Sequence, residues 1–327
     1  MKKKPIFLTP YFKEMIWGGS RLRDVFGYDI PSNETGECWA ISARSEGESI
    51  VSGGMYAGQR LGALWKNHPE LFGYPDSEEK EFPLLTKIID AKEDLSVQVH
   101  PDDAYAEVWE NGSLGKTECW YILDCDADAT IVIGHNAKDK EELRRMVEEG
   151  KWSELIREIP IRPGDFFQIE PGTVHAIKKG TLVLETQENS DITYRFYDYD
   201  RVRDGKKRQL HVEKSLAVAT APYEPVVQEP WREGNVTRYV YCSHYGVMKV
   251  DVTDAMPQML LQDKAFMNAS VVSGSGSIDG IRIKAGDHFI LPYQYGVMAL
   301  EGDMSVVFSY PTRRYSSEGK NCALLHA

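Results

Sequence analysis

An alternating segment at residues 95–102 limits what this chain can fold into. Its sequence, Leu-Ser-Val-Gln-Val-His-Pro-Asp, places an apolar residue at every second position up to the histidine. A period of two predicts a β-strand with one buried face. Pro101 ends the strand, because proline cannot donate a hydrogen bond to a neighbouring strand. Gln98 and His100 then project from one side, where they either face solvent or offer two ligands to a metal ion.

The composition is that of a globular protein with excess negative charge. The chain has 327 residues, 42% of them hydrophobic and 27% charged, which is enough for two domains with buried cores. Lysine and arginine number 38 and aspartate and glutamate 50, so the net charge is −12. This balance argues against a general binder of nucleic acid or of anionic membranes. It leaves room for a small anionic substrate held by a few local cations.

The cysteines and the N-terminal residues favour a cytoplasmic protein. Five cysteines are scattered without a Cys-x-x-Cys pair, at positions 38, 119, 125, 242 and 322. This pattern suits a reducing compartment and argues against a thiolate zinc site. The basic start is not followed by an apolar run long enough for a signal peptide, and no stretch approaches the length of a membrane span.

Most of the chain reads as short strands separated by turns. Strands are predicted at 38–42, 48–52, 82–89, 95–100, 117–123, 130–134, 166–169 and 182–186, and helices at 61–71, 139–149, 152–156 and 211–220. The two helices within about 137–158 interrupt β-rich sequence, which predicts a small helical insertion on the outside of the fold. Prolines at 222, 225 and 230 mark a linker, so we expect domains at 1–220 and 221–327.

A weak internal repeat suggests that the two domains are alike. Residues 285–296 repeat the Gly-Asp turn, the apolar strand and the proline of residues 163–175. Where the first copy has His175, the second offers only Tyr295 or Gly296. The repeat predicts two similar β-barrels, of which only the first carries potential metal ligands.

Three potential metal ligands lie on separate predicted strands. His100, Glu118 and His175 could converge inside a jelly-roll barrel, with Gln98 as an optional fourth ligand. Such a set leaves a coordination position open, as a catalytic zinc site requires. Two histidines and one carboxylate would also suit non-haem iron.

Two further residues each allow two interpretations. Lys87 interrupts the apolar run at 82–89, so it is either paired or functional in a buried place, or it reaches solvent at a sheet edge. Trp17 precedes Gly18 and Gly19 and either lines a pocket or belongs to the core.

The chain resembles the type I mannose-6-phosphate isomerases in their short bacterial form, within the cupin superfamily. The resemblance covers nearly the whole chain and rests on several motifs in the same order. These are Trp17-Gly18-Gly19 and residues 36–42, 82–91, 95–102, 115–121, 171–176 and 185–195. The modest insertion at 137–158 fits the short form, because longer members carry a large helical domain. Residues 177–180 depart from the aromatic-containing stretch that longer members carry after the second histidine.

The resemblance implies the fold and the site residues. The expected fold is mainly β, with two cupin jelly-roll domains, and one zinc ion per chain is expected. The implied zinc ligands are Gln98, His100, Glu118 and His175; the implied catalytic residues are Arg195, Lys87, Glu185 and Asp191; the implied substrate-binding residues are Ser96, Lys116 and Trp17.

The implied reaction interconverts mannose 6-phosphate and fructose 6-phosphate through a cis-enediol. The base that moves the proton between the two carbons stays open among Glu185, Asp191, Lys87 and a water on the metal. Arg195 stays protonated, so we assign it to electrostatic stabilisation or to positioning of charged oxygens. Lys87 and Lys116 are the expected phosphate contacts.

Two other classes of function are compatible with parts of this pattern. An iron-dependent cupin dioxygenase would use the same ligands but would not explain Lys87, Lys116 and Arg195. A non-catalytic sugar-phosphate-binding or regulatory protein would tolerate loss of the ligands, yet all four positions are filled. Arg195 could also form only a structural ion pair with Asp191. We expect a sugar phosphate as partner, no nucleic acid or membrane, and a monomer or homodimer.

Overall fold

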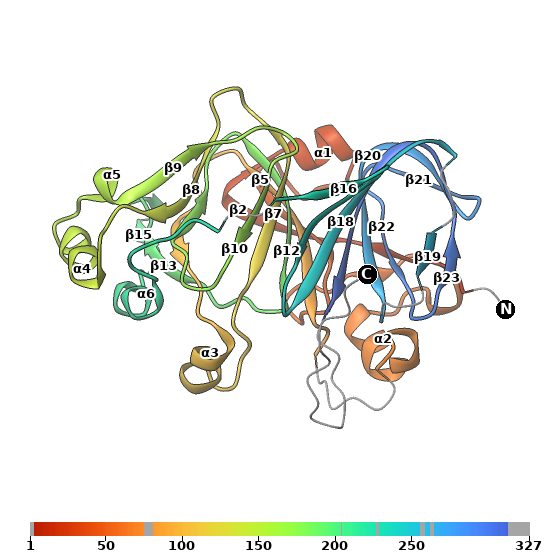
Figure 1. Cartoon of the computed structure of the whole chain (residues 1–327), viewed down its shortest axis with the longest axis horizontal. Helices are drawn as coiled ribbons and strands as arrows, with labels where there is room; N and C mark the ends of the chain where they lie inside the picture. Colours follow the sequence, from red (N-terminus) through yellow and green to blue (C-terminus); the bar gives the residue numbers. More distant parts are fainter. Residues whose placement is uncertain are drawn as a thin grey trace. The chain divides into compact units, whose positions relative to one another are not determined.

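Strands dominate the fold, and its helices are short (Figure 1). The computed structural model describes residues 3–74, 81–203, 205–226, 229–255, 259–261 and 265–312; Cys322 lies outside them. Their arrangement confirms the mainly-β prediction. None of the described helices is both long and apolar enough to cross a membrane.

The chain forms two compact units, each built from separate stretches of sequence. The described residues of 12–39 and 85–228 form the unit that we call the His100 unit. The described residues of 1–11, 40–84 and 229–327 form the unit that we call the β20 unit. In each unit the described strands form sheets that are not closed into barrels, an arrangement consistent with the predicted cupin fold.

Two sheets make up the His100 unit. The six-stranded sheet runs in the order β10 (Phe166–Ile169), β7 (Glu118–Cys125), β12 (Thr181–Glu188), β5 (Leu84–Ala91), β3 (Thr35–Ile41) and β2 (Tyr11–Gly19). The five-stranded sheet runs in the order β13 (Tyr194–Tyr197), β6 (Val97–Val99), β11 (His175–Ile177), β8 (Thr130–His135) and β9 (Ile156–Pro160). A hairpin of β14 (Val202–Arg203) and β15 (Lys206–Lys207) follows β13.

Apolar side chains from both sheets share one core, so the sheets pack face to face. Trp120 and Val183 of the six-stranded sheet lie in the same cluster as Ile131 and Ile177 of the five-stranded sheet. The segment at 95–102 contains the strand β6, which ends before Pro101 as predicted. Val97 and its neighbour two residues on pack into a second cluster, on the other face of the five-stranded sheet. Gln98 therefore points from β6 toward the space between the sheets.

Short helices cover the outer face of the five-stranded sheet. The predicted insertion is confirmed as α4 (Lys140–Glu148) and α5 (Trp152–Leu155) between β8 and β9, and α6 (Val212–Val218) packs in the same cluster (Figure 1). Asp139 caps α4 by accepting a hydrogen bond from the backbone N–H of Glu142 at 2.7 Å. Leu143 is the fully buried apolar residue of this helix. The unit also contains α1 (Arg21–Phe26) and α3 (Asp103–Trp109).

One large sheet organises the β20 unit. Its order is β16 (Trp231–Glu233), β17 (Val236–Tyr241), β18 (Tyr245–Ala255), β24 (Leu300–Pro311), β20 (Met267–Ile278), β22 (His288–Leu291), β1 (Ile6–Thr9) and β4 (Ile50–Val51), with β21 (Ile281–Lys284) paired to β20. A separate pair joins β19 (Met259–Leu261) and β23 (Gly296–Met298). The predicted helix at 61–71 is α2 (Leu61–Asn67) followed by a 3-10 turn at Pro69–Leu71; another 3-10 turn spans Gly54–Tyr56.

The compact units do not coincide with the continuous domains expected at 1–220 and 221–327. β1 pairs with β22 in the register Ile6↔Ile290, and with β4 in the register Leu8↔Val51. The N-terminal strand therefore belongs to the sheet that is built mainly from the C-terminal third of the chain. Within that unit the weak repeat is visible as strands, because Gly296 opens β23 as His175 opens β11.

Candidate metal centre and active site

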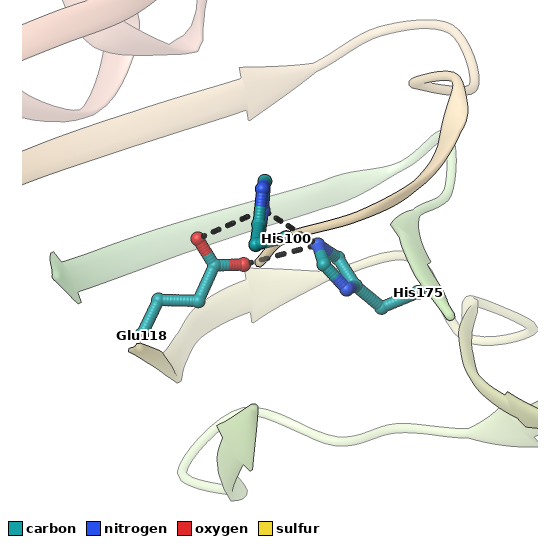
Figure 2. Close-up of side chains that lie close together, drawn as sticks. All are labelled: His100, Glu118 and His175. Carbon is teal, nitrogen blue, oxygen red and sulfur yellow. Dashed lines mark hydrogen bonds and ion pairs between the residues drawn. The ribbon is translucent and has the colours of Figure 1, made fainter. Parts of the chain in front are cut away.

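Two histidines and a glutamate converge between the sheets of the His100 unit (Figure 2). His100 follows β6, His175 opens β11, and Glu118 opens β7 on the opposite sheet. The backbone register sets His175 directly across from Gln98. One potential ligand atom from each of the three residues lies within 4.8 Å of the others, and all three side chains are buried. The convergence predicted from the sequence is confirmed.

The donor atoms of this cluster face one another. Nε2 of His175 lies 3.2 Å from Oε1 of Glu118, and Nε2 of His100 lies 3.6 Å from Oε2 of Glu118. The two Nε2 atoms are 3.1 Å apart (Figure 2). Two imidazole nitrogens and a carboxylate within this distance form the donor set of a metal centre.

The outer hydrogen bonds of the histidines fix which nitrogen carries the proton. Nδ1 of His100 lies 2.8 Å from the carbonyl oxygen of Ile192, and Nδ1 of His175 lies 2.8 Å from the carbonyl oxygen of Thr173. A carbonyl only accepts, so Nδ1 is the protonated nitrogen in both neutral rings and both Nε2 atoms present lone pairs. Two lone pairs 3.1 Å apart repel each other unless a cation is shared between them. This pattern of backbone-oriented histidines is typical of metal ligands.

Glu118 supplies the negative charge of the cluster. Both of its carboxylate oxygens are buried, and neither accepts a hydrogen bond of normal geometry from the described residues, although Nζ of Lys116 lies 2.6 Å from Oε2. Burial raises the pKa of Glu118, but the ammonium of Lys116 beside it outweighs burial and holds that pKa well below its ordinary value. Burial and the Lys116 ammonium lower the pKa of His100. Neutral His100 and ionised Glu118 have the protonation states that metal ligation requires.

Gln98 lies at the edge of the cluster. Its Nε2 atom is 3.2 Å from Nε2 of His175. The two ends of a carboxamide exchange by a 180° rotation, which would turn the Oε1 atom of Gln98 toward the cluster instead. Gln98 can thus supply a fourth oxygen donor, and its role as a ligand stays a prediction.

A buried ion pair lies on the facing sheet. Nζ of Lys87 on β5 is 3.3 Å from Oε2 of Glu185 on β12, and the indole Nε1 of Trp120 donates to Oε1 of Glu185 at 3.1 Å. Burial lowers the pKa of Lys87, but the charges of Glu185 and Glu37 outweigh it and raise that pKa. Of the two interpretations of Lys87, the structure supports the buried and paired one. The Trp120 ring also lies edge-on to His175, at 5.5 Å between centroids, which links this pair to the metal cluster.

Trp39 and Glu37 lie near Lys87 and were not assigned to the site from the sequence. Nζ of Lys87 lies 5.4 Å from the ring centroid of Trp39, and Nζ of Lys13 lies 3.5 Å from the same ring. The Trp39 indole donates to Oε2 of Glu37 at 2.6 Å. Both belong to the motif at 36–42, which carries part of the resemblance. The sequence of this strand does not show which lysines, far away in the chain, lie over its tryptophan.

Arg195 reaches the site from the strand next to Gln98. On β13 it is the register partner of Gln98. Its Nη1 donates to the carbonyl oxygen of Gln209 at 2.9 Å, and its buried Nε has no hydrogen-bond partner among the described residues. Burial and the nearby Arg208 lower the pKa of Arg195.

Asp198, the carboxylate nearest to Arg195 along the chain, is bonded to other arginines. Asp198 accepts hydrogen bonds from Arg201 and Arg208. Within the described part of the chain, no carboxylate lies at ion-pair distance from Arg195, so the alternative of a structural pair with Asp191 is not supported. Arg195 presents a half-buried cation that an anionic group can approach.

The remaining predicted residues differ in their surroundings. Lys116 is buried, with Nζ 3.3 Å from Nε2 of His100. Ser96 is buried just before β6, whereas Asp191 is exposed in the segment before β13. Trp17 is 2% exposed and belongs to the core between the sheets. The catalytic and substrate-binding roles of these residues stay predictions.

Comparison with known proteins gives the same assignment along nearly the whole chain. The family model described as phosphomannose isomerase type I, catalytic domain, matches residues 6–124, and the one described as mannose-6-phosphate isomerase, cupin domain, matches residues 235–311. In Bacillus subtilis (strain 168), a probable mannose-6-phosphate isomerase, GmuF, is 51% identical over 94% of this chain and 99% of its own. Mannose-6-phosphate isomerase ManA of the same strain is 50% identical over 95% of this chain and 100% of its own. The crystal structure of a mannose 6-phosphate isomerase from Bacillus subtilis is 47% identical, has a TM-score of 0.89, and covers 94% of this chain and 100% of its own.

Proposed function

Since the chain belongs to the type I phosphomannose isomerase family, we propose that it interconverts mannose 6-phosphate and fructose 6-phosphate through a cis-enediol, with one zinc ion per chain. The observation that carries the proposal is the buried cluster of His100, Glu118 and His175, whose donor atoms face one another. Two nitrogens and one carboxylate oxygen, with an amide as an optional fourth donor, suit a zinc site that keeps a position open for substrate. When bound, zinc would supply a Lewis acid that stabilises negative charge on the sugar oxygens.

The chain's own residues would provide the remaining chemistry. Lys87 and Glu185 form a buried pair of opposite charge, so they can hold and pass a proton away from bulk water. We place the proton transfer between the two carbons at this pair rather than at Asp191, which is exposed. Arg195 would stabilise negative charge without donating a proton, because its guanidinium stays charged and has no carboxylate at ion-pair distance among the described residues.

The rival functions receive less support from these contacts. An iron-dependent dioxygenase has no need of a buried lysine–glutamate pair beside its metal. A protein that only binds sugar phosphates has no need of paired lone electron pairs on His100 and His175. We also infer a reducing, cytoplasmic location, because Cys38 and Cys125 form no disulfide and the sequence holds no Cys-x-x-Cys pair.

The test is an assay of the purified protein with mannose 6-phosphate, coupled to detection of fructose 6-phosphate. We expect turnover that is lost with a chelator and returns with zinc, at one zinc per chain by elemental analysis. His100→Ala should lower turnover and zinc affinity by more than about 100-fold, because even outer partners of metal ligands change these quantities 10- to 100-fold.

His68→Ala is the matched control, since His68 lies outside the site, where its ring nitrogen contacts Glu70. It should behave as the wild type does. Absence of turnover in the zinc-loaded wild type would overturn the proposal. Oxygen consumption by an iron-loaded protein would instead favour the dioxygenase.

A further inference from the structure

We propose that His211 is a positioning residue that holds the backbone of Arg195 in place, and that it does so only as a neutral imidazole. The inference rests on the proposed function, in which Arg195 stabilises charge on the substrate. His211 precedes α6 and is not among the residues that the sequence assigned to the site. Its part in the site depends on three hydrogen bonds between its segment and Arg195.

Residues 209–211 form hydrogen bonds with both the backbone and the side chain of Arg195. The backbone N–H of Arg195 donates to Nδ1 of His211 at 3.1 Å, and the backbone N–H of His211 donates to the carbonyl oxygen of Arg195 at 2.8 Å. The guanidinium donates in turn to the carbonyl oxygen of Gln209 at 2.9 Å. The backbone and the side chain of Arg195 are therefore both tied to one short segment.

The place of β13 in the sheet explains why this support is needed. β13 is an edge strand of the five-stranded sheet, with β6 on one side only. The outer backbone groups of an edge strand have no strand partner. At Arg195 the His211 ring and backbone take the place of that missing strand. Arg195 lies opposite Gln98 in the register with the inner strand, and its backbone N–H and carbonyl oxygen are both bonded to His211.

The chemistry of the bond to Nδ1 fixes the protonation state of His211. A backbone N–H can only donate, so Nδ1 must present a lone pair and the proton of the neutral ring lies on Nε2. Protonation would make both ring nitrogens donors and would break this bond. It would also place a second positive charge beside Arg195.

The charged groups around His211 keep it neutral. Arg195 faces it from β13 and Lys214 from α6, while Glu110 after α3 is the opposing charge. Glu110 is itself engaged, because Lys214 and the hydroxyl of Tyr194 each donate to its carboxylate at 2.6 Å. Burial, Arg195 and Lys214 lower the pKa of His211 below its ordinary value of about 6.5. Because the pKa of His211 is lowered in the folded protein, the hydrogen bond from Arg195 is intact at neutral pH. It is lost as the pH falls through this lowered pKa.

Two variants separate the effect of losing the hydrogen bond to Arg195 from the effect of protonating His211. His211→Ala removes the acceptor and should lower kcat/KM about 10-fold at pH 7.5, the loss expected from one hydrogen bond that positions a catalytic group. His211→Asn keeps an acceptor oxygen near the position of Nδ1 but cannot be protonated. Its activity at pH 7.5 should stay within about 2-fold of the wild type. The ratio of its activity to that of the wild type should rise as the pH falls, since ionisations shared by both proteins cancel.

A flat ratio across the pH range, or wild-type activity in His211→Ala, would overturn the inference. A third measurement needs no turnover, so it separates failure of this inference from failure of the proposed function. The pKa of His211, followed by NMR of its ring protons, should rise in Arg195→Met, because that variant removes a neighbouring cation. An unchanged pKa would show that the two residues are not coupled.

Discussion

Lys87 and Glu185 show how a charged residue can occupy an otherwise apolar strand. Every residue of β5 is buried, and a lone ammonium there would be very unfavourable. Glu185 on β12 supplies the opposite charge at 3.3 Å, and Trp120 supplies a hydrogen bond to the same carboxylate. The pair is therefore mutually dependent: each member makes the other tolerable inside the fold.

Removing one member of this pair should cost more than removing both. We expect Lys87→Met to lower the free energy of unfolding by about 3–5 kcal/mol, because Glu185 is left buried and unpaired. The double variant Lys87→Met with Glu185→Gln should recover most of that loss while remaining inactive. Urea unfolding of the wild type, both single variants and the double variant gives the coupling energy. Additive effects, within about 0.5 kcal/mol, would contradict the dependence.

Among the strands and helices, the pairing of β8 with β9 depends on one glycine. Gly134 has φ +85°, and a β-carbon there would lie 2.0 Å from a ring atom of Tyr223. The pairing of β8 with β9 is irregular between Val132 and His135, around this glycine. The backbone conformation and the close ring both exclude any larger residue.

Gly134→Ala should therefore be far more harmful than a glycine substitution in open space. Gly150, just after α4, also has positive φ (+68°), but nothing lies within 4 Å of its missing β-carbon. We expect Gly150→Ala to cost about 1–2 kcal/mol from backbone strain alone, and Gly134→Ala to cost about 3 kcal/mol or more. Chemical denaturation of the two variants measures the difference. Equal losses would mean that the Tyr223 ring moves aside freely.

The boundaries of α4, α5 and β9 show where strand pairing overrides the local spacing of apolar residues. The apolar spacing of 139–149 predicted a helix, and α4 fills most of that range. Residues 152–156 were predicted as a helix, but α5 ends at Leu155 and β9 begins at Ile156. β9 pairs with β8 in the register Ile131↔Ile159, a contact that no local pattern contains.

At the scale of the whole molecule, bound zinc should stabilise the fold that supplies its ligands. Glu118 and His175 lie on strands of two different sheets and His100 follows a third strand, so the unfolded chain cannot present these ligands together. At a free zinc concentration about 100 times its Kd, we expect a gain of about 2.7 kcal/mol and a rise in Tm of at least about 5 °C. Thermal unfolding of the metal-free protein with and without zinc measures it. His68→Ala should show the same rise and His100→Ala none; a rise in His100→Ala would place the stabilising metal elsewhere.

The amino-acid sequence alone predicts the strand period, the helical insertion and the residues that bind metal in the proposal. These features are local, because a period of two, a helical spacing of apolar residues and a His-Pro pair act over a few neighbouring residues. The resemblance to a family added Arg195 through motifs in a fixed order, and it gave an expected role to Lys87, which its apolar run had already distinguished.

Which of these residues contact one another is known only from the three-dimensional structure. It joined β1 to β22, tied Lys87 to Glu185, set Nε2 of His100 against Nε2 of His175, and brought His211 to Arg195. These contacts join residues far apart in the chain, and their geometry depends on strand order and register. Hydrogen bonding and sheet packing act across space, so a one-dimensional pattern names the residues but does not pair them.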